Sequence, residues 1–167
     1  FLESKRVIVE PSGFNVRDDE INPMLFPFQR DITRWALGRG KAALFEDCGL
    51  GKTPQQLEWA RLSNLFTCKP VLILAPPAVA NQTQEDGYKF SVPVTICETQ
   101  SDVVNGVNIT NYEKLHHFSD KGWGGIVLDE SSILKAYDGK TRKALSVFAH
   151  NIPYRLCCTA TPAPNDL

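Results

Sequence analysis

The chain has 167 residues, of which 43% are hydrophobic and 22% are charged, and its net charge is −1. These values are typical of one globular domain with a substantial core, and they exclude a disordered chain. The near-neutral charge provides no general attraction for nucleic acid, so any DNA contact would depend on a local patch. No apolar stretch is long enough to cross a membrane and no signal peptide is visible, so we expect no membrane partner.

The cysteines favour a reducing, intracellular setting. Their number is odd and no C-x-x-C pair occurs, which predicts neither a disulfide framework nor a zinc site. Cys157 and Cys158 lie in an apolar run and are expected to be small core residues. The three tryptophans are expected to pack in or near the core at positions 35, 59 and 123.

Apolar patterning predicts strands that alternate with helices along the chain. Residues 1–24 are expected to form a strand and loop segment, with the strand at 6–10, and residues 25–167 the main domain. The expected helices cover 27–37, 53–66, 79–90 and 141–149. The expected strands cover 42–45, 71–75, 92–97, 107–110, 125–128 and 154–158. This alternation predicts an α/β fold with a mostly parallel central sheet and helices on both faces.

A glycine loop follows the strand at 42–45 and reads Glu-Asp-Cys-Gly-Leu-Gly-Lys-Thr over residues 46–53. A strand, a loop ending in Gly-Lys-Thr and a helix form a phosphate cradle, because glycines let backbone N–H groups approach phosphate oxygens. Lys52 would neutralise the β- and γ-phosphates, and the Thr53 hydroxyl would bind Mg²⁺. The full pattern has glycine where this chain has Glu46, so a glycine-rich turn that caps a helix is the alternative for this stretch alone.

An acidic pair, Asp129 and Glu130, follows the apolar run at 125–128. Carboxylates after a buried strand are costly unless they have a role there. In a nucleotide site the first would hold Mg²⁺ and the second would activate the attacking water. Capping of the next helix is the alternative, which the two following serines would also suit. Because ligands bind at the carboxyl ends of parallel strands, we expect the pair to lie beside the glycine loop and residues 159–161.

On these residues the chain resembles the first RecA-like domain of a superfamily-2 helicase. It is closest to the Swi/Snf-type double-stranded-DNA translocases, and the short forms carried by phages and prophages fit best. In family order, the motifs are an adenine-reading Q motif at 25–29, motif I at 46–53, motif Ia at 72–76, motif Ib at 107–113, a DExx box at 127–132 and motif III at 159–162. The family also has acids in place of the first glycine of motif I. Two departures are Asn81-Gln82, where a Trp is usual, and Ala163-Pro164-Asn165 after motif III.

The resemblance implies a three-layer RecA-like P-loop domain with ATP and Mg²⁺ as cofactors. It implies that the catalytic residues are Lys52, Asp129 and Glu130, with Mg²⁺ held by Thr53 and Asp129. The implied nucleotide-binding residues are Gln29, Cys48, Gly49, Leu50, Gly51, Lys52 and Thr53. The implied contacts with DNA or a second lobe are Pro76, Thr110, Asn111, Thr159 and Thr161. Without the resemblance, we would expect Gln29 to be a solvent-facing helix residue, and the implied contacts with DNA to be ordinary loop residues.

The implied function is the ATP-binding and hydrolysing lobe of a DNA-dependent ATPase, helicase or double-stranded-DNA translocase in a bacterial or phage-infected cytoplasm. The chain begins at Phe1 and stops after motif III, so we expect a longer protein whose second RecA-like lobe supplies arginine fingers. Alone, the chain is expected to be nearly inactive, because neither Arg142 nor Arg155 lies in a suitable motif. The alternatives are a restriction or repair helicase motor and a nucleotide-binding module without hydrolysis. The basic cluster at 135–143 and the two histidines at 116 and 117 are expected on the surface.

Overall fold

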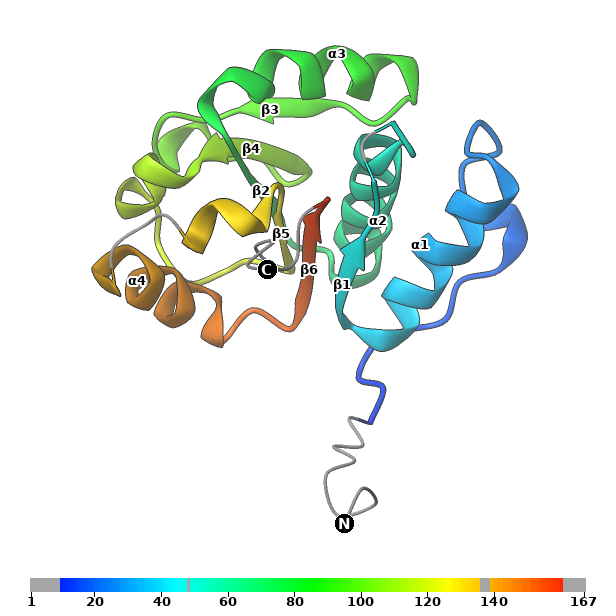
Figure 1. Cartoon of the computed structure of the whole chain (residues 1–167), viewed down its shortest axis with the longest axis horizontal. Helices are drawn as coiled ribbons and strands as arrows, with labels where there is room; N and C mark the ends of the chain where they lie inside the picture. Colours follow the sequence, from blue (N-terminus) through cyan, green and yellow to red (C-terminus); the bar gives the residue numbers. More distant parts are fainter. Residues whose placement is uncertain (1–9, 48, 136–138, 161–167) are drawn as a thin grey trace, which may run out of the picture.

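The protein is described by a computed structural model over residues 10–47, 49–135 and 139–160. Within these residues six strands form one sheet in the order β1-β6-β5-β2-β4-β3, and every neighbouring pair is parallel (Figure 1). The strands are β1 (Lys41–Phe45), β2 (Val71–Ala75), β3 (Val94–Ile96), β4 (Val107–Asn111), β5 (Gly125–Leu128) and β6 (Tyr154–Thr159). The α-helices are α1 (Pro27–Arg39), α2 (Lys52–Thr67), α3 (Ala80–Lys89) and α4 (Gly139–His150). Short 3-10 helices are η2 (Asp18–Glu20), η3 (Pro77–Val79), η4 (Gln100–Asp102), η5 (Tyr112–His117) and η6 (Ser131–Lys135).

Helices cover both faces of the sheet, and the central strand β2 shows why. Successive side chains of a strand point to opposite faces, so Val71 belongs to one apolar cluster and Leu72 to another. The first cluster includes side chains of α1 and α2, and the second includes those of η5 and α4, which lie across the sheet in Figure 1. All five residues of β2 are buried, as its continuous apolar run predicted. The predicted α/β class with helices on both faces is confirmed.

Helix α1 positions one predicted site residue, and its tryptophan lies at the surface. The helix begins at Pro27, which needs no N–H partner in the first turn, and ends at Arg39, where it is capped by Gly40 with a φ of +73°. Phe28 and Trp35 follow the helical spacing of apolar residues in this helix, but their side chains are 44% and 52% exposed. Trp59 and Trp123 are core residues as expected, whereas Trp35 lies at the surface with about half of its side chain exposed. The helix instead packs through smaller or polar side chains one position further on, namely Gln29, Thr33, Ala36 and Leu37.

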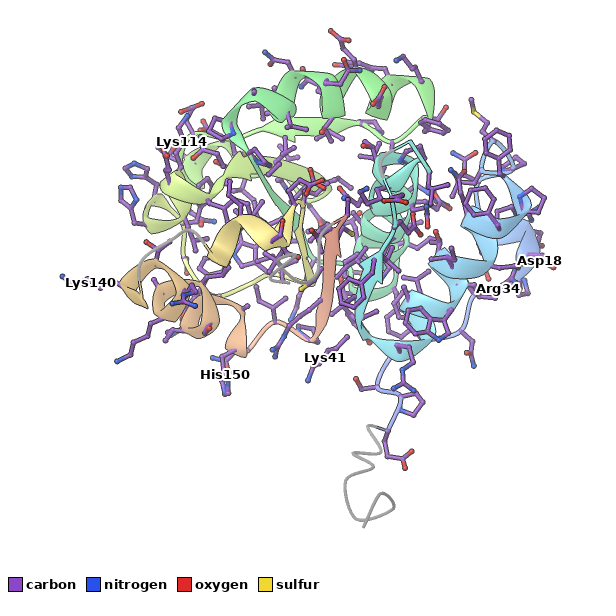
Figure 2. The ribbon with its side chains drawn as sticks, in the orientation of Figure 1. Asp18, Arg34, Lys41, Lys114, Lys140 and His150 are labelled. Carbon is purple, nitrogen blue, oxygen red and sulfur yellow. The ribbon has the colours of Figure 1, made fainter. Side chains whose placement is uncertain are left out.

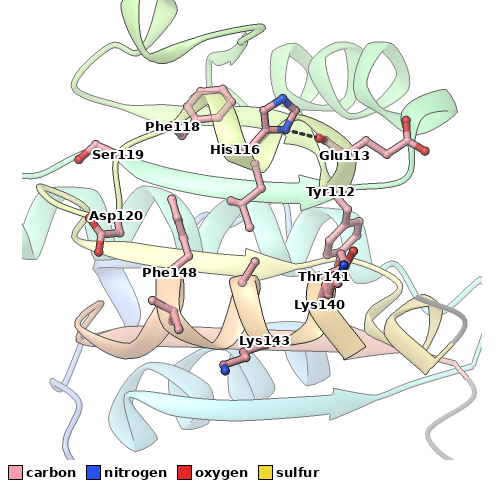
Figure 3. A pocket seen from close by; sticks show the side chains of 13 residues that line it. Tyr112, Glu113, His116, Phe118, Ser119, Asp120, Lys140, Thr141, Lys143 and Phe148 are labelled. Atoms are coloured by element: carbon pink, nitrogen blue, oxygen red, sulfur yellow. Dashed lines mark hydrogen bonds between the residues drawn. The ribbon is translucent and has the colours of Figure 1, made fainter. Parts of the chain in front are cut away.

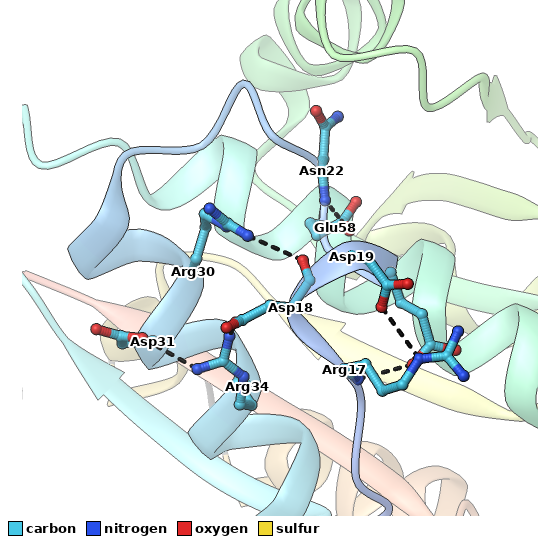
Figure 4. A network of polar contacts seen from close by, with 9 residues as sticks. Arg17, Asp18, Asp19, Asn22, Arg30, Asp31, Arg34 and Glu58 are labelled. Atoms are coloured by element: carbon cyan, nitrogen blue, oxygen red, sulfur yellow. Dashed lines mark hydrogen bonds and ion pairs between the residues drawn. The ribbon is translucent and has the colours of Figure 1, made fainter.

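The segment before α1 is held to the domain by polar contacts (Figure 4). The Asn22 N–H donates to Glu58 Oε1 of α2 at 2.8 Å, and Arg34 of α1 pairs with the Asp18 carboxylate. Glu58 is buried, and it is compensated by Arg61 Nη2 at 2.6 Å because an unpaired buried carboxylate would be costly. Phe14 and Ile21 of the segment belong to the first apolar cluster, and Leu25 is also buried. The boundary at residue 24 stays a prediction, and the strand expected at 6–10 lies almost wholly outside the described residues.

The other elements match their predicted positions closely. In α4 the side chains of Leu145 and Phe148 are buried, as their three-residue spacing predicted. Strand β3 is shorter than the expected range, and Cys158 is buried whereas Cys157 is only half-buried. Among the helices of the described residues, none combines the length and the apolar character that crossing a membrane requires.

Candidate functional site

The glycine loop joins β1 to α2 at the carboxyl edge of the sheet. Gly49 and Gly51 have φ values of +88° and +76°, in a region that a residue with a Cβ rarely adopts. A Cβ on Gly51 would lie 2.3 Å from Gln29 Nε2, whereas a Cβ on Gly49 would meet nothing within 4 Å. The loop is therefore packed against α1 at Gly51 and open at Gly49, which is the side a phosphate could approach. Cys48 lies outside the described residues.

Lys52 begins α2 and its ammonium group lies against the loop itself. Nζ donates to the carbonyl oxygen of Glu46 at 2.8 Å and to that of Asp47 at 3.2 Å. These neutral acceptors are weaker partners for an ammonium group than an anionic oxygen is. Lys52 is therefore positioned to exchange them for phosphate oxygens, and the half-buried Thr53 follows it in the first helical turn.

Glu46, which stands where the full motif has glycine, fastens the loop to α2. Its carboxylate is buried, and Oε2 accepts a hydrogen bond from Gln55 Nε2 at 2.8 Å. The same Gln55 amide donates to the Gly51 carbonyl at 3.2 Å. Glu46 Oε1 has no hydrogen-bond partner among the described residues. A buried, half-satisfied carboxylate next to the open side of the loop is a place where a bound cation or water would complete the polar contacts.

The acidic pair lies two strands from the glycine loop, at the same edge. β6 separates β1 from β5, so the two strand ends are about 10 Å apart. Gln56 of α2 bridges this gap, because its Nε2 donates to Asp129 Oδ1 at 2.6 Å. The Asp129 N–H donates to the Leu74 carbonyl at 2.8 Å, which fixes the backbone beside β2. The structure thus brings Lys52, Thr53 and Asp129 to one edge, as the sequence predicted.

Glu130 has a backbone conformation that is unusual for its residue type. Its φ is +47°, and a non-glycine residue in this region is strained by about 1–3 kcal/mol. Its carbonyl accepts the Ile133 N–H at 2.9 Å as η6 begins. The hydroxyl of the buried Tyr112 donates to the Asp129 carbonyl at 2.7 Å, immediately before the strained residue. The backbone around Glu130 is thus held in place by the first residue of η5, which follows β4.

Gln29 lies against the glycine loop, and both ends of its amide are used. Nε2 donates to the Leu50 carbonyl at 3.0 Å, and Oε1 accepts the Phe26 N–H at 3.0 Å. The side chain is only 4% exposed. An adenine edge would have to compete with these two main-chain groups. The geometry therefore favours a role for Gln29 in holding the loop to the start of α1, in addition to any contact with the base.

The residues expected to contact DNA divide between two places. Thr110 and Asn111 end β4 and line a cavity of about 210 Å³ together with Pro77, and Pro76 precedes Pro77 at the end of β2. Thr159 lies instead at the glycine loop, where its carbonyl accepts the Glu46 N–H at 3.3 Å. Thr161 lies outside the described residues.

A cavity of about 720 Å³ lies elsewhere, between η5 and α4 (Figure 3). Leu115, Phe118 and Phe148 are buried side chains in its lining, and Lys140 and Lys143 of the predicted basic cluster also line it. None of the described residues of the glycine loop or the acidic pair lines it. Lys140, Arg142 and Lys143 are exposed, as expected for a solvated helix face. Lys140 and Lys143 therefore belong to a cavity other than the nucleotide-type site.

The acidic groups fit a magnesium ion that is held mainly by other ligands. Within residues 10–47, 49–135 and 139–160, no group of three or more His, Cys, Asp or Glu could hold a metal. Mg²⁺ usually keeps several waters and binds one or two protein groups plus substrate phosphates, which suits Thr53 with Asp129. Nearby, burial raises the pKa of the Cys158 thiol, and the Asp129 carboxylate raises it further, so this thiol stays protonated.

The comparisons with known proteins concern the fold of the chain. No family model matches the chain. In structure it is similar to the SWI2/SNF2 ATPase core of Sulfolobus solfataricus in complex with dsDNA, with a TM-score of 0.75 and 24% identity over 92% of this chain and 35% of that one. The chain has the RecA-like fold of part of a SWI2/SNF2 ATPase core. The UvsW helicase of bacteriophage T4 has a TM-score of 0.69 at 14% identity, over 81% of this chain and 52% of that one.

In sequence, the chain is 27% identical over 165 residues to the SWI/SNF-related matrix-associated actin-dependent regulator of chromatin subfamily A-like protein 1 of Xenopus tropicalis. The match covers 87% of this chain but only 16% of the frog protein. The chain thus spans about a sixth of this relative and about a third of the archaeal ATPase core.

Sequence reasoning missed three residues that shape the site: Gln55, Gln56 and Tyr112. The available signal for Gln55 and Gln56 was a pair of adjacent amides one residue after Gly-Lys-Thr, on a helix that must pack against a sheet. Nothing comparable marked the Tyr112 hydroxyl, because its partner is the backbone carbonyl of Asp129, which is distant in the sequence and follows β5.

Proposed function

We propose that this chain is the first, ATP-binding lobe of a DNA-dependent ATPase of the Swi/Snf type, which acts on double-stranded DNA without reading its sequence. The observation that carries the proposal is the hydrogen bond from Gln56 to Asp129, which ties the helix of the glycine loop to the acidic pair. The similarity to a SWI/SNF-related frog protein and to an archaeal SWI2/SNF2 core supports the type of motor. In this proposal the lobe covers residues 25–167 and works inside a cell with a second RecA-like lobe.

Each residue has a separate task in the proposed site. Bound Mg·ATP would supply the γ-phosphoryl group and the metal charge that catalysis needs. Lys52 would turn from the loop carbonyls to phosphate oxygens, while Thr53 and Asp129 would hold the metal. Glu130 would orient a water and accept its proton. Pro76, Thr110 and Asn111 would contact the DNA backbone through groups that hold phosphates without reading bases.

Two substitutions separate nucleotide binding from chemistry. Lys52→Ala should weaken Mg·ATP binding strongly in calorimetry, because the phosphate charge loses its fixed cation. Lys69→Ala is the matched control, since Lys69 is exposed in the turn before β2, at the opposite edge of the sheet. Equal ATP affinity in Lys52→Ala and the parent would overturn the assignment of the cradle.

Glu130→Gln should retain ATP but lose turnover, because an amide cannot accept the proton. The measurement requires the second lobe, since an arginine finger is worth roughly 10³–10⁵ in rate. We expect the 167-residue chain alone to hydrolyse ATP barely above background, with or without double-stranded DNA. Robust DNA-stimulated phosphate release by the chain alone would refute the two-lobe proposal. Binding of ATP without turnover in the two-lobe protein would indicate a nucleotide-binding module instead.

A further inference from the structure

A small cavity of about 210 Å³ opens at the carboxyl edge of the sheet, on the far side of β2 from the glycine loop. Its walls come from the start of α3, the turn after β3 and the end of β4. The residues that carry the argument are Asn81, Glu98, Thr110, Asn111 and Lys114. The first turn of a helix such as α3 presents backbone N–H groups without helical partners, which favours an anion.

Thr110 provides a second, independent sign that this cavity takes a polar ligand. Its side chain is 3% exposed and lines the cavity, yet its Oγ1 has no hydrogen-bond partner in the described part of the chain. A buried hydroxyl without a partner costs about 1–3 kcal/mol, and such groups call for an explanation in a ligand or a water.

The cation at this cavity is Lys114 of η5, the short helix that follows β4, and Figure 2 labels it. Its backbone is anchored, because the Lys114 N–H donates to Asn111 Oδ1 at 3.0 Å. Its ammonium group forms an ion pair with Glu98, and both side chains line the cavity. The side chains are 34% exposed for Lys114 and 64% exposed for Glu98, so the carboxylate can leave without crossing packed structure.

We propose that Glu98 acts as an internal competitor that occupies Lys114 as a DNA phosphate would. A carboxylate and a phosphodiester are both oxyanions that accept hydrogen bonds from an ammonium group. When duplex DNA reaches this edge, a phosphate oxygen replaces the Glu98 carboxylate on Lys114 and accepts from Thr110 Oγ1. This inference rests on the proposed DNA-binding function and adds one cation and one self-inhibitory contact to it.

The exchange has a direct consequence for affinity. The ammonium group of Lys114 must separate from Glu98 before it can bind a phosphate, so the ion pair lowers the affinity of the free protein for DNA. Exposed ion pairs are weak, which makes the competition reversible and limits it to a few-fold effect. Both the ion pair and the phosphate contact are screened by salt, so the difference in duplex affinity between the parent and Glu98→Gln should be largest at low ionic strength.

The test measures fluorescence anisotropy of a short labelled duplex with the 167-residue chain over a salt series. Glu98→Gln should tighten binding about two- to five-fold at low salt. Lys114→Gln should weaken binding and lower the slope of log K against log salt by about 0.9, the value for one lost phosphate contact. In the Lys114→Gln background, Glu98→Gln should have no further effect. Because Glu98 and Lys114 are surface side chains, circular dichroism should show the same fold in each variant.

Two matched variants control for net charge. Glu113→Gln removes a charge next to Lys114 in the sequence, but Glu113 lines the larger cavity between η5 and α4. Lys121→Gln removes an exposed cation from the turn before β5, at the amino edge of the sheet. Both should leave duplex affinity within about 1.5-fold of the parent, since exposed charges away from the contact contribute little.

The outcomes separate this inference from the proposed function. Parental affinity in Glu98→Gln, equal tightening by Glu113→Gln, or tightening that persists without Lys114 would each overturn the competitor role while leaving DNA binding intact. If the parent and Glu98→Gln both fail to bind duplex at any salt concentration, the DNA-binding proposal fails and the inference falls with it.

Discussion

Replacement of Gly51 by alanine tests how the glycine loop is held. Ala at this position must adopt a φ of +76°, and its Cβ would lie 2.3 Å from Gln29 Nε2. The amide is the end of a flexible side chain and can move, but movement breaks its hydrogen bonds to Leu50 and Phe26. Gly49→Ala has the same backbone problem with open space around the Cβ, so it is the matched control.

The expected magnitudes follow from these contacts. A non-glycine residue in the left-handed region costs roughly 1 kcal/mol in both variants. Two lost hydrogen bonds cost about 1 kcal/mol each, which applies only to Gly51→Ala. We therefore expect a loss of about 3 kcal/mol in the free energy of unfolding for Gly51→Ala and about 1 kcal/mol for Gly49→Ala. The change in unfolded-state entropy on replacing glycine is the same in both and cancels in the comparison.

Urea unfolding of both variants measures the difference, provided that the m-values agree with the parent. A double-mutant cycle of Gly51→Ala with Gln29→Ala tests the same contacts, because Gln29→Ala alone already removes the two hydrogen bonds of the Gln29 amide. The two substitutions should then be non-additive by about 2 kcal/mol. A difference below about 0.5 kcal/mol between Gly51→Ala and Gly49→Ala, within the usual error of additivity, would refute the role of Gln29 as the support of the loop.

Three further predictions address neighbouring groups. Gln29→Ala should weaken ATP and GTP binding alike in calorimetry, since its amide supports the loop; a selective loss for ATP would instead support adenine reading. Tyr112→Phe should lower the free energy of unfolding by about 1 kcal/mol and reduce DNA-stimulated turnover in the two-lobe protein, because the Asp129 carbonyl loses its hydroxyl donor; unchanged stability and turnover would argue against this link. Burial raises the pKa of the Cys97 thiol to about 11, so alkylation of the native protein at pH 8, followed by mass spectrometry, should modify the exposed Cys68 well before Cys97. The raised folded pKa also means that the stability from the protonated Cys97 is fully present below the unfolded pKa of about 8.5 and is lost as pH rises toward 11, a loss that Cys97→Ala should abolish.

The order of strands and helices was predictable because each element has a strong local signal. β2 is a continuous apolar run, and α4 repeats apolar residues at helical spacing. The glycine loop and Asp129 were predictable because parallel strands bring their carboxyl ends to one edge. These features depend on the spacing of apolar residues and on the direction of the strands, which can be inferred from the sequence without knowledge of the tertiary contacts.

The supporting contacts were not predictable for the opposite reason. From the sequence alone Gln56 would be a surface residue, and only the tertiary structure places Asp129 opposite it. Glu46 is a poor match to the glycine of the full phosphate-loop pattern, and only the structure shows that its buried carboxylate accepts a hydrogen bond from Gln55. Trp35 followed the apolar pattern of α1 but remains half-exposed, because packing against the loop selected the neighbouring face. Such choices are made by partners distant in sequence, which local patterns do not encode.

The position of β6 between β1 and β5 has a consequence for how the protein is made. Among the six described strands β1 is synthesised first and β6 last, so β1 and β5 cannot join the same sheet until residues 154–159 appear. During synthesis both strands keep an unpaired edge, which is open to pairing with other chains. A polypeptide that ends before Tyr154 would therefore have the glycine loop and the acidic pair on strands that are not joined in one sheet. Ordered, aggregation-free expression should begin only with chains that include the whole of β6.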